Sequence, residues 1–516
     1  MEVQRRPSKN GLTPATTASS PSQTGPTVAQ VVAAVPTSKQ RWTRSSRLWC
    51  KAAKLVLNVM RPACSSGPLT WLLTFTFTLG NIFTGKPPAD QSDADLLCMT
   101  TMVATSCHCI TVLAPYALSL QKFSHLDGTP WTLFQLVTRL TKKVWCFYFA
   151  VHVLAIGATY AIVSAAHDFS AVFKTHLYLS CMWNSLYRAA VDEASRFVYQ
   201  RETMEGDRRG YVNNAPHWKR YCQAVGRATN FTVIAIVAAS LVHICSVLDL
   251  LQSNFATLKF SIGSVALKSI VLTITKWLAL KRGGTHLRKI YVLTAVPTVL
   301  INTQVRLVLL RNGKSGSSLR SFLELGMLEP SMRMTKVWHL RRTMGHQKRV
   351  QGNRRGETKP VAAVQAGVRR VSTILPLSKS SEHRLVRSAT IFDARQSLLH
   401  FHAAESHAEM CSEYIAIICS TSIFFFLQHH PRFGWHNEKE SDLVEWEETL
   451  LAGVWQVGIE VVVDFICCVF ELANGIPLHA AERLGGFLTA VFTSSALVSV
   501  SISTILCAHE AGSTQL

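Results

Sequence analysis

The sequence predicts an all-α fold, a multi-pass transmembrane helical bundle of about nine spans within a range of eight to ten. Three observations predict it. Apolar residues gather into separate runs of about 20, the length that crosses a bilayer as a helix. Only 16% of the residues are charged, against 48% that are hydrophobic. The net charge of +22 lies in blocks beside the apolar runs, as cytoplasmic Lys and Arg do in membrane proteins, so nucleic acid is not expected as a partner.

The amino-terminal arm, residues 1–66, is rich in Ser, Thr, Pro and Arg and is predicted to be disordered. Its last part, Arg41–Arg61, interleaves basic residues with Trp and Leu, which fits either a helix on an anionic membrane surface or an ordinary basic flank. The arm contains one acid, Glu2, as a mitochondrial transit peptide would. The mitochondrial inner membrane is therefore a minor alternative for the location of this integral membrane protein.

The apolar runs follow one another along the rest of the chain, at 68–84, 95–120, 144–164, 228–251, 260–280, 290–310, 414–428, 450–472 and 485–507. A tenth candidate, 170–191, is weaker because Lys174, His176 and Asn184 interrupt it. The first run contains the alternation TFTFT, which suits a strand, but a lone strand in lipid would leave its backbone groups without hydrogen bonds. We therefore expect every run to be helical.

Charge in the loops predicts the topology. Residues 311–400 contain 18 Lys and Arg against 5 Asp and Glu, and the amino-terminal arm contains 10 against 1. Both are predicted to be cytoplasmic, so an even number of spans separates them. One of the seven candidates between 68 and 310 is then not a full span. We expect it to be 170–191, with 260–280 as the alternative because Lys268 and Lys276 weaken it; either choice leaves the carboxyl terminus outside.

This topology predicts five regions: the arm at 1–66, a first transmembrane group at 67–310, a basic loop at 311–410, the last three transmembrane helices at 411–507 and a tail at 508–516. The loop is predicted to be cytoplasmic and partly disordered, and its charge suits the anionic lipids of the inner leaflet. Within it, RRVS at 369–372 makes Ser372 a candidate phosphorylation site for a basophilic kinase.

The run at 450–472 carries three acids, Glu460, Asp464 and Glu471. At about 100° per residue they fall within about 40° of one another on a helix. A charge near the bilayer centre costs at least ~2.5 kcal/mol, so such acids normally face a bundle interior or a wet cavity. The stripe predicts a cation or proton site. The alternative is structural pairing with basic residues in other apolar runs, for which the candidates are Lys268, Lys276 and Arg306.

A second polar set lies in HFHAAESHAEMCSEY at 400–414, where Glu405 and Glu409 are four residues apart, His400 and His407 are seven apart, and Cys411 and Glu413 follow. Such side chains suit a transition metal, but the spacing matches no metal motif, and a polar helix entering a membrane has the same composition. No metal is therefore assigned. The chain contains no GxSxG, HExxH or GxGxxG pattern, so the sequence predicts neither an enzyme nor a cofactor.

The segment EVVVDFICCVFELANGIP, 460–477, resembles the carboxyl-terminal part of uncharacterised multi-pass membrane proteins of oomycetes. There, a similar apolar helix carries spaced acids and ends in a short Gly-Ile turn. The resemblance implies a membrane location and no particular activity.

These observations predict a transporter or channel for a proton, a small cation or a cation-coupled solute, in which Glu460 and Asp464 bind the ion. The alternative is a membrane scaffold or receptor-like protein that transports nothing. In that case the acids are structural, and the basic loop at 311–410 binds anionic lipid or protein partners.

Overall fold

The structure, a computed structural model, describes residues 38–79, 85–87, 90–165, 175–209, 216–247, 254–281, 287–312, 326, 330–342, 379–428, 430, 432, 446–476, 478 and 484–507. Across these ranges the chain forms helices and turns, with two isolated bridges and no strand, so the all-α fold class is confirmed. The chain divides into two units, residues 1–47 and 48–516. The contacts described below lie within the second unit.

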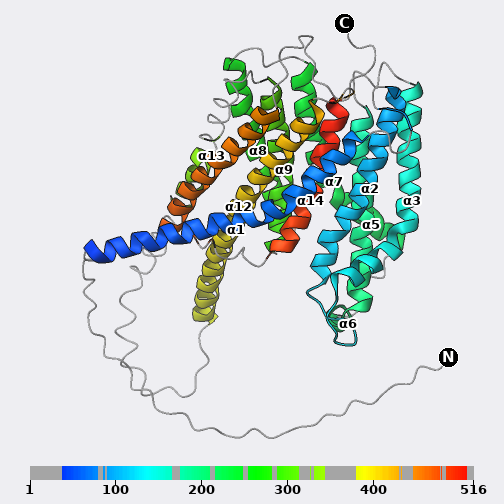
Figure 1. The fold of residues 1–516 in the computed structure, drawn as a ribbon. Helices are drawn as coiled ribbons and strands as arrows, with labels where there is room; N and C mark the ends of the chain where they lie inside the picture. Colours follow the sequence, from blue (N-terminus) through cyan, green and yellow to red (C-terminus); the bar gives the residue numbers. More distant parts are fainter. Residues whose placement is uncertain are drawn as a thin grey trace, which may run out of the picture. The chain divides into compact units, whose positions relative to one another are not determined.

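Eleven helices carry labels in Figure 1: α1 (Ser38–Thr78), α2 (Asp93–Leu120), α3 (Leu133–Ala165), α5 (Thr175–Glu202), α6 (Met204–Arg209), α7 (His217–Val247), α8 (Asn254–Lys281), α9 (Leu287–Asn312), α12 (Lys379–Leu427), α13 (Trp446–Ala473) and α14 (Gly485–Cys507). A shorter helix covers residues 330–342.

Seven of these helices are long and apolar enough to cross a membrane, at Asp93–Leu120, Leu133–Ala165, Trp218–Leu241, Arg288–Leu310, Leu399–Leu427, Glu447–Ala473 and Gly485–Leu506. They indicate an integral membrane protein. Each covers all or most of one of the nine predicted runs. Of the other two runs, 260–280 lies within α8, 68–84 begins in α1, which ends at Thr78, and α5 contains most of the segment 170–191. The count of nine spans is therefore not confirmed.

Burial separates central from peripheral helices. The span of α9 is 89% buried and that of α12 is 83% buried, whereas the span of α3 is only 22% buried. One hydrophobic core joins α9, α12 and α14 around Tyr291, Tyr414 and Phe492. A second core joins α2, α3 and α5, which lie together in Figure 1, around Leu136 and Tyr187. The charged residues of interest lie in and around the first core.

Contacts near their ends show that the central helices α9, α12 and α14 run in the same direction. Arg288 at the start of α9 donates a hydrogen bond to the Leu118 carbonyl at the end of α2, and its guanidinium covers the ring of Phe487 at the start of α14. These residues define what we call the α2–α3 end of the bundle. His407 packs on Tyr291, one turn into α9. Further along, the Cys419 thiol of α12 donates to the Ala496 carbonyl of α14 at 3.7 Å, so α9, α12 and α14 all run away from the α2–α3 end.

Helix α13 runs the other way, beside α12. The Cys468 thiol donates to the Met410 sulfur at 3.5 Å, and Gly453, near the start of α13, lies against Thr421, near the end of α12. A Cβ atom on Gly453 would lie 3.0 Å from two side-chain atoms of Thr421, so glycine is what allows this close approach.

The helix at 330–342 runs parallel to α13 and ends at the α2–α3 end. Gly326 lies against Ile459, and further along Arg341 donates to the Asn474 side chain at 3.0 Å. The segment 326–342 and α13 therefore run in the same direction. Residues 330–342 were predicted to belong to a partly disordered loop. They are helical because Arg333, Val337 and Leu340 repeat at helical spacing and bury one face.

Two further predicted boundaries fall inside helices. Residues 38–66 of the amino-terminal arm are helical, because Leu55, Val56 and Val59 form an apolar face that is buried. The boundary between 410 and 411 lies within α12. Residues 343–378, with Ser372, and the tail at 508–516 lie outside the described residues.

Candidate functional site

The three acids of the predicted stripe lie on one face of α13, turned toward the bundle. Glu460, Asp464 and Glu471 are at most 2% exposed. On the opposite face, Val462 is 59% exposed and Ile466 is 51% exposed. Because charge is costly in lipid and apolar side chains are not, this amphipathic pattern orients α13 with its acids inward.

Two of these acids share a single guanidinium. Arg333 donates from Nη1 to Asp464 Oδ1 at 2.7 Å and from Nη2 to Glu471 Oε2 at 3.1 Å. Its Nε donates to the other oxygen of Glu471 at 3.3 Å, so the pair with Glu471 is bidentate. The sequence did not predict this partner, because Arg333 lies in the segment interpreted as a basic loop.

The third acid pairs with α9. Arg306 Nη2 lies 3.5 Å from Glu460 Oε2, and its Nη1 donates to Gln456 Oε1 at 3.3 Å. Arg306 was one of the three predicted partners of the stripe. It lies in the 89% buried span of α9, where a cation requires a nearby counter-charge.

Helix α12 also carries a row of acids, Glu405, Glu409 and Glu413. They follow one another at four-residue steps, and each is at most 4% exposed. Lys336 of the helix at 330–342 lies 2.7 Å from Glu409 and 3.5 Å from Glu405. Lys268 of α8 donates to Glu413 at 3.0 Å. Lys268 was also a predicted partner, although for the acids of α13.

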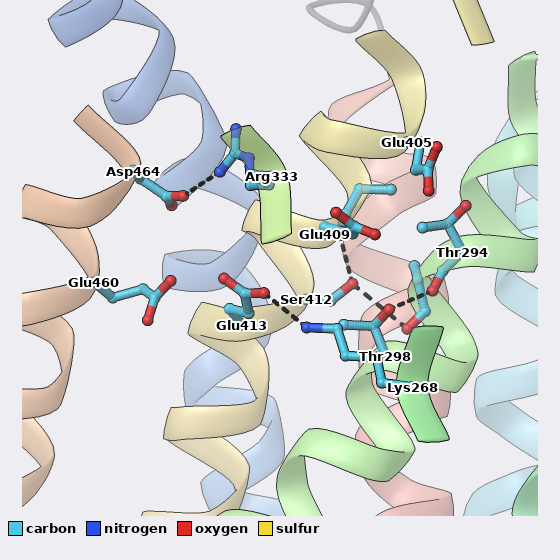
Figure 2. Close-up of polar contacts among 12 residues, drawn as sticks. Lys268, Thr294, Thr298, Arg333, Glu405, Glu409, Ser412, Glu413, Glu460 and Asp464 are labelled. Atoms are coloured by element: carbon cyan, nitrogen blue, oxygen red, sulfur yellow. Dashed lines mark hydrogen bonds and ion pairs between the residues drawn. The ribbon is translucent and has the colours of Figure 1, made fainter. Parts of the chain in front are cut away.

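Glu413, Glu460 and Asp464 form what we call the carboxylate cluster. One oxygen from each lies within 4.8 Å of the others. In Figure 2, the Glu413 carboxylate lies between that of Glu460 and the Lys268 ammonium. Two helices, α12 and α13, therefore bring three fully buried carboxylates to one point.

Among the side chains that the structure describes around the cluster, the buried acids outnumber the bases. Among the described side chains there are six carboxylates, of Glu405, Glu409, Glu413, Glu460, Asp464 and Glu471, and four basic groups, of Lys268, Arg306, Arg333 and Lys336. If every group carries its ordinary charge, the described set has two negative charges in excess. An excess of buried negative charge favours the uptake of protons or of a cation.

The remaining sequence predictions have different outcomes. The side chain of Lys276 in α8 lies outside the described residues. The donors at 400–414 do not converge on one point: His400 is exposed, His407 packs on Tyr291 and contacts the Cys411 thiol at 3.6 Å, and Glu413 joins the cluster. The structure thus divides this predicted set, and its acids associate with α13 and with the helix at 330–342.

Comparison of the chain with protein-family models, with curated proteins and with solved structures finds no match. The resemblance of 460–477 to oomycete membrane proteins therefore stays a prediction.

Proposed function

We propose that this integral membrane protein moves protons, or a solute coupled to protons or small cations, and that the carboxylate cluster is its binding centre. The observation that carries the proposal is the convergence of three fully buried carboxylates from two helices within 4.8 Å. Carboxylates this close resist simultaneous ionisation, so such a group takes up a proton or a cation more readily than an isolated acid does.

The neighbouring bases favour a proton over a metal ion. Carboxylate oxygens are the donors that hard cations such as Ca²⁺ prefer. However, the Lys268 ammonium and the Arg333 guanidinium already contact two of the three acids, at 3.0 and 2.7 Å. A dication would be repelled by both, whereas a proton shared between Glu413 and Glu460 adds only one charge and needs no coordination sphere.

The acids then have different roles. Glu471 is held by two hydrogen bonds from Arg333, which suits a fixed structural pair. Glu460 has a longer contact to its base, 3.5 Å from Arg306, and faces Glu413 across the helix interface. We assign proton binding to Glu413 and Glu460 and a supporting role to Asp464, whose charge is partly balanced by Arg333.

We also propose a topology with more crossings than the predicted nine. The lengths of the helices and their order along the chain support passages by α1, α2, α3, α5, α7, α8, α9, α12, α13 and α14, and the direction of the helix at 330–342 supports one more between Asn312 and Arg342. The last passage is supported by the helix at 330–342, which runs along α13 to the α2–α3 end. With it, eight passages separate the amino-terminal arm from the basic loop, which satisfies the even number that the charges require.

The ion pairs also favour a second candidate, a membrane scaffold that transports nothing. They join α8, α9, α12, α13 and the helix at 330–342, and removing one member of a buried pair typically costs about 3–5 kcal/mol. In this reading all six acids are structural, and the basic loop binds lipid or protein partners.

Proton flux into proteoliposomes separates the two candidates. We would record an internal pH dye under an imposed membrane potential for wild type, Glu413→Gln, Glu460→Gln and the double variant Glu460→Gln, Asp464→Asn. Glu448→Gln is the matched control, because Glu448 lies on the same helix and is exposed. Thermal unfolding of each variant in detergent would be measured beside the flux.

The transport proposal predicts flux in wild type and in Glu448→Gln and its loss in the cluster variants, including those that remain folded at the temperature of the assay. Wild-type vesicles that pass neither protons nor Na⁺, K⁺ or Ca²⁺, together with cluster variants that unfold early, would instead support the scaffold.

A further inference from the structure

A surface pocket lies at the start of α3, far along the chain from the carboxylate cluster. Its volume is about 610 Å³, and its lining includes Trp131, Phe134, Arg139 and Lys142. The loop before α3 shapes it: the His125 amide donates to the Thr129 carbonyl at 2.9 Å, closing a tight turn. A pocket of this size is large enough for a small organic group.

The basic residues of the pocket are not equally engaged. Arg139 makes two hydrogen bonds to the carboxylate of Glu202, at 3.0 and 3.1 Å, and Lys143, which is not part of the lining, lies 3.8 Å from the same acid. Glu202 thus anchors these two bases. Lys142 is exposed and has no ion pair with any residue that the structure describes. Its ammonium is therefore available to an anion in the pocket.

Lys142 lies on the face of α3 that points away from the bundle. Positions 134, 142, 145 and 149 share one side of a helix at about 100° per residue. Phe134 is 80% exposed, Trp145 60% and Phe149 67%. In a membrane protein an exposed aromatic face of this kind contacts lipid, so the pocket opens beside a lipid-covered surface.

The length of α3 places the pocket at the level of the headgroups. A helix of 33 residues spans about 50 Å, whereas the hydrocarbon core is about 30 Å thick. The excess lies at the amino-terminal end, because Gln135, Arg139 and Lys142 are polar and the apolar run begins at 144. Lysine at such a boundary extends its ammonium toward the lipid phosphates.

We propose that this pocket binds the headgroup of a phospholipid. The phosphate lies against the Lys142 ammonium, Trp131 and Phe134 pack against the glycerol region, and the acyl chains follow the Trp145–Phe149 face of α3. The site is independent of the carboxylate cluster, so either proposal can fail without the other.

The test is lipid binding by the full-length protein. Delipidated protein in detergent is titrated with phosphatidylglycerol, and bound lipid is counted by native mass spectrometry for wild type, Lys142→Gln and Phe134→Ala. The controls are Lys219→Gln and Trp218→Ala, a matched exposed pair at the start of α7 outside the pocket. We expect Lys142→Gln to weaken the tightest binding event about fivefold, the effect of one lysine near an anionic surface, and Phe134→Ala to weaken it as well.

Three outcomes would overturn the proposal. The pocket variants could bind lipid as wild type does, which would show that the pocket is not the site. The Lys219→Gln control could weaken binding as much as Lys142→Gln, which would show that only net charge matters. Inorganic phosphate could displace the lipid at equal concentration, which would identify the site as one for free phosphate.

Discussion

Arg333 joins two acids that lie two helical turns apart on α13, with its Nη1 2.7 Å from Asp464 Oδ1 and its Nη2 3.1 Å from Glu471 Oε2. A residue from the segment with the highest density of basic side chains is thus buried against the acids of α13. The helix at 330–342 is attached to α13 by charge as well as by packing.

Loss of this guanidinium is expected to destabilise the protein. Arg333→Met leaves Asp464 and Glu471 buried without their base, which costs about 3–5 kcal/mol for a buried pair. Thermal unfolding in detergent should show a lower midpoint for Arg333→Met, whereas Arg342→Met, at an exposed position of the same helix, should unfold like wild type.

A triple variant tests the cause of that loss. Adding Asp464→Asn and Glu471→Gln to Arg333→Met removes the uncompensated charges, so the unfolding midpoint should recover most of the way to wild type. A triple variant as unstable as Arg333→Met alone would mean that the arginine acts through its packing and not through its charge.

The contact between Gly453 and Thr421 predicts a size effect at the α12–α13 interface. Gly453→Ala would place a methyl group 3.0 Å from Thr421 Cγ2 and Oγ1, so the helices must separate or Thr421 must shift. We expect a destabilisation of about 1–3 kcal/mol, the usual cost of overpacking. Gly458→Ala on the same helix meets nothing within 4 Å and should be neutral or stabilising, since alanine favours helix over glycine.

The double variant Gly453→Ala, Thr421→Ala removes the two Thr421 atoms that would lie 3.0 Å from the new methyl group. Its unfolding midpoint should lie above that of Gly453→Ala alone. If Thr421→Ala gives no recovery, the close approach of the two helices is not what requires glycine at 453.

The comparison of sequence with structure shows which features local patterns predict. The stripe of α13 was predictable because three acids in an apolar run must face inward. Lys268 and Arg306 were predicted together with Lys276, because a basic residue in an apolar run also needs a counter-charge. Arg333 and Lys336 were not predicted, because the many basic residues around them indicate a cytoplasmic loop. The helical spacing of Arg333, Val337 and Leu340 was the available signal. However, the pattern of one short helix is weaker evidence than the many basic residues around it.

The span count was less predictable for a related reason. Hydropathy measures single helices, whereas α5 and α8 place polar side chains against other helices. Ser185 and Lys268, for example, are both buried within the bundle. A segment that hides its polar groups in this way can cross a membrane with low average hydropathy.

Acid should weaken the contacts of His430, which lies just after α12. Its Nε2 lies 3.2 Å from the Thr78 carbonyl and its Nδ1 accepts from the Arg432 amide at 3.2 Å, an arrangement that requires the neutral ring. Burial lowers the pKa of His430, the Thr78 carbonyl partly opposes this, and Arg432 lowers the pKa further. Because the folded pKa is below the unfolded value of 6.5, the unfolded chain binds more protons, and stability is lost as the pH falls below 6.5.

The variant His430→Gln isolates this effect. It should be less stable than wild type at neutral pH, since it loses the hydrogen bonds of His430 with the Thr78 carbonyl and the Arg432 amide. The difference between the two unfolding midpoints should shrink as the pH falls below 6.5. A difference that stays constant across this range would show that His430 does not titrate in folding.

The proposed passage between Asn312 and Arg342 makes a prediction about sidedness. Epitope tags inserted at Gly128, in the α2–α3 loop, and at Gly352, in the basic loop, should be accessible from the same face of the membrane, and a tag at Lys86 from the other face. The reason is geometric: α9 runs away from the α2–α3 end, and the helix at 330–342 returns to it beside Asn474. If the chain did not return, Gly352 would share a side with Lys86. Arg333 and Lys336 would then have to reach the buried acids from the opposite end of the bundle, which their contacts with Glu471 and Glu405 contradict.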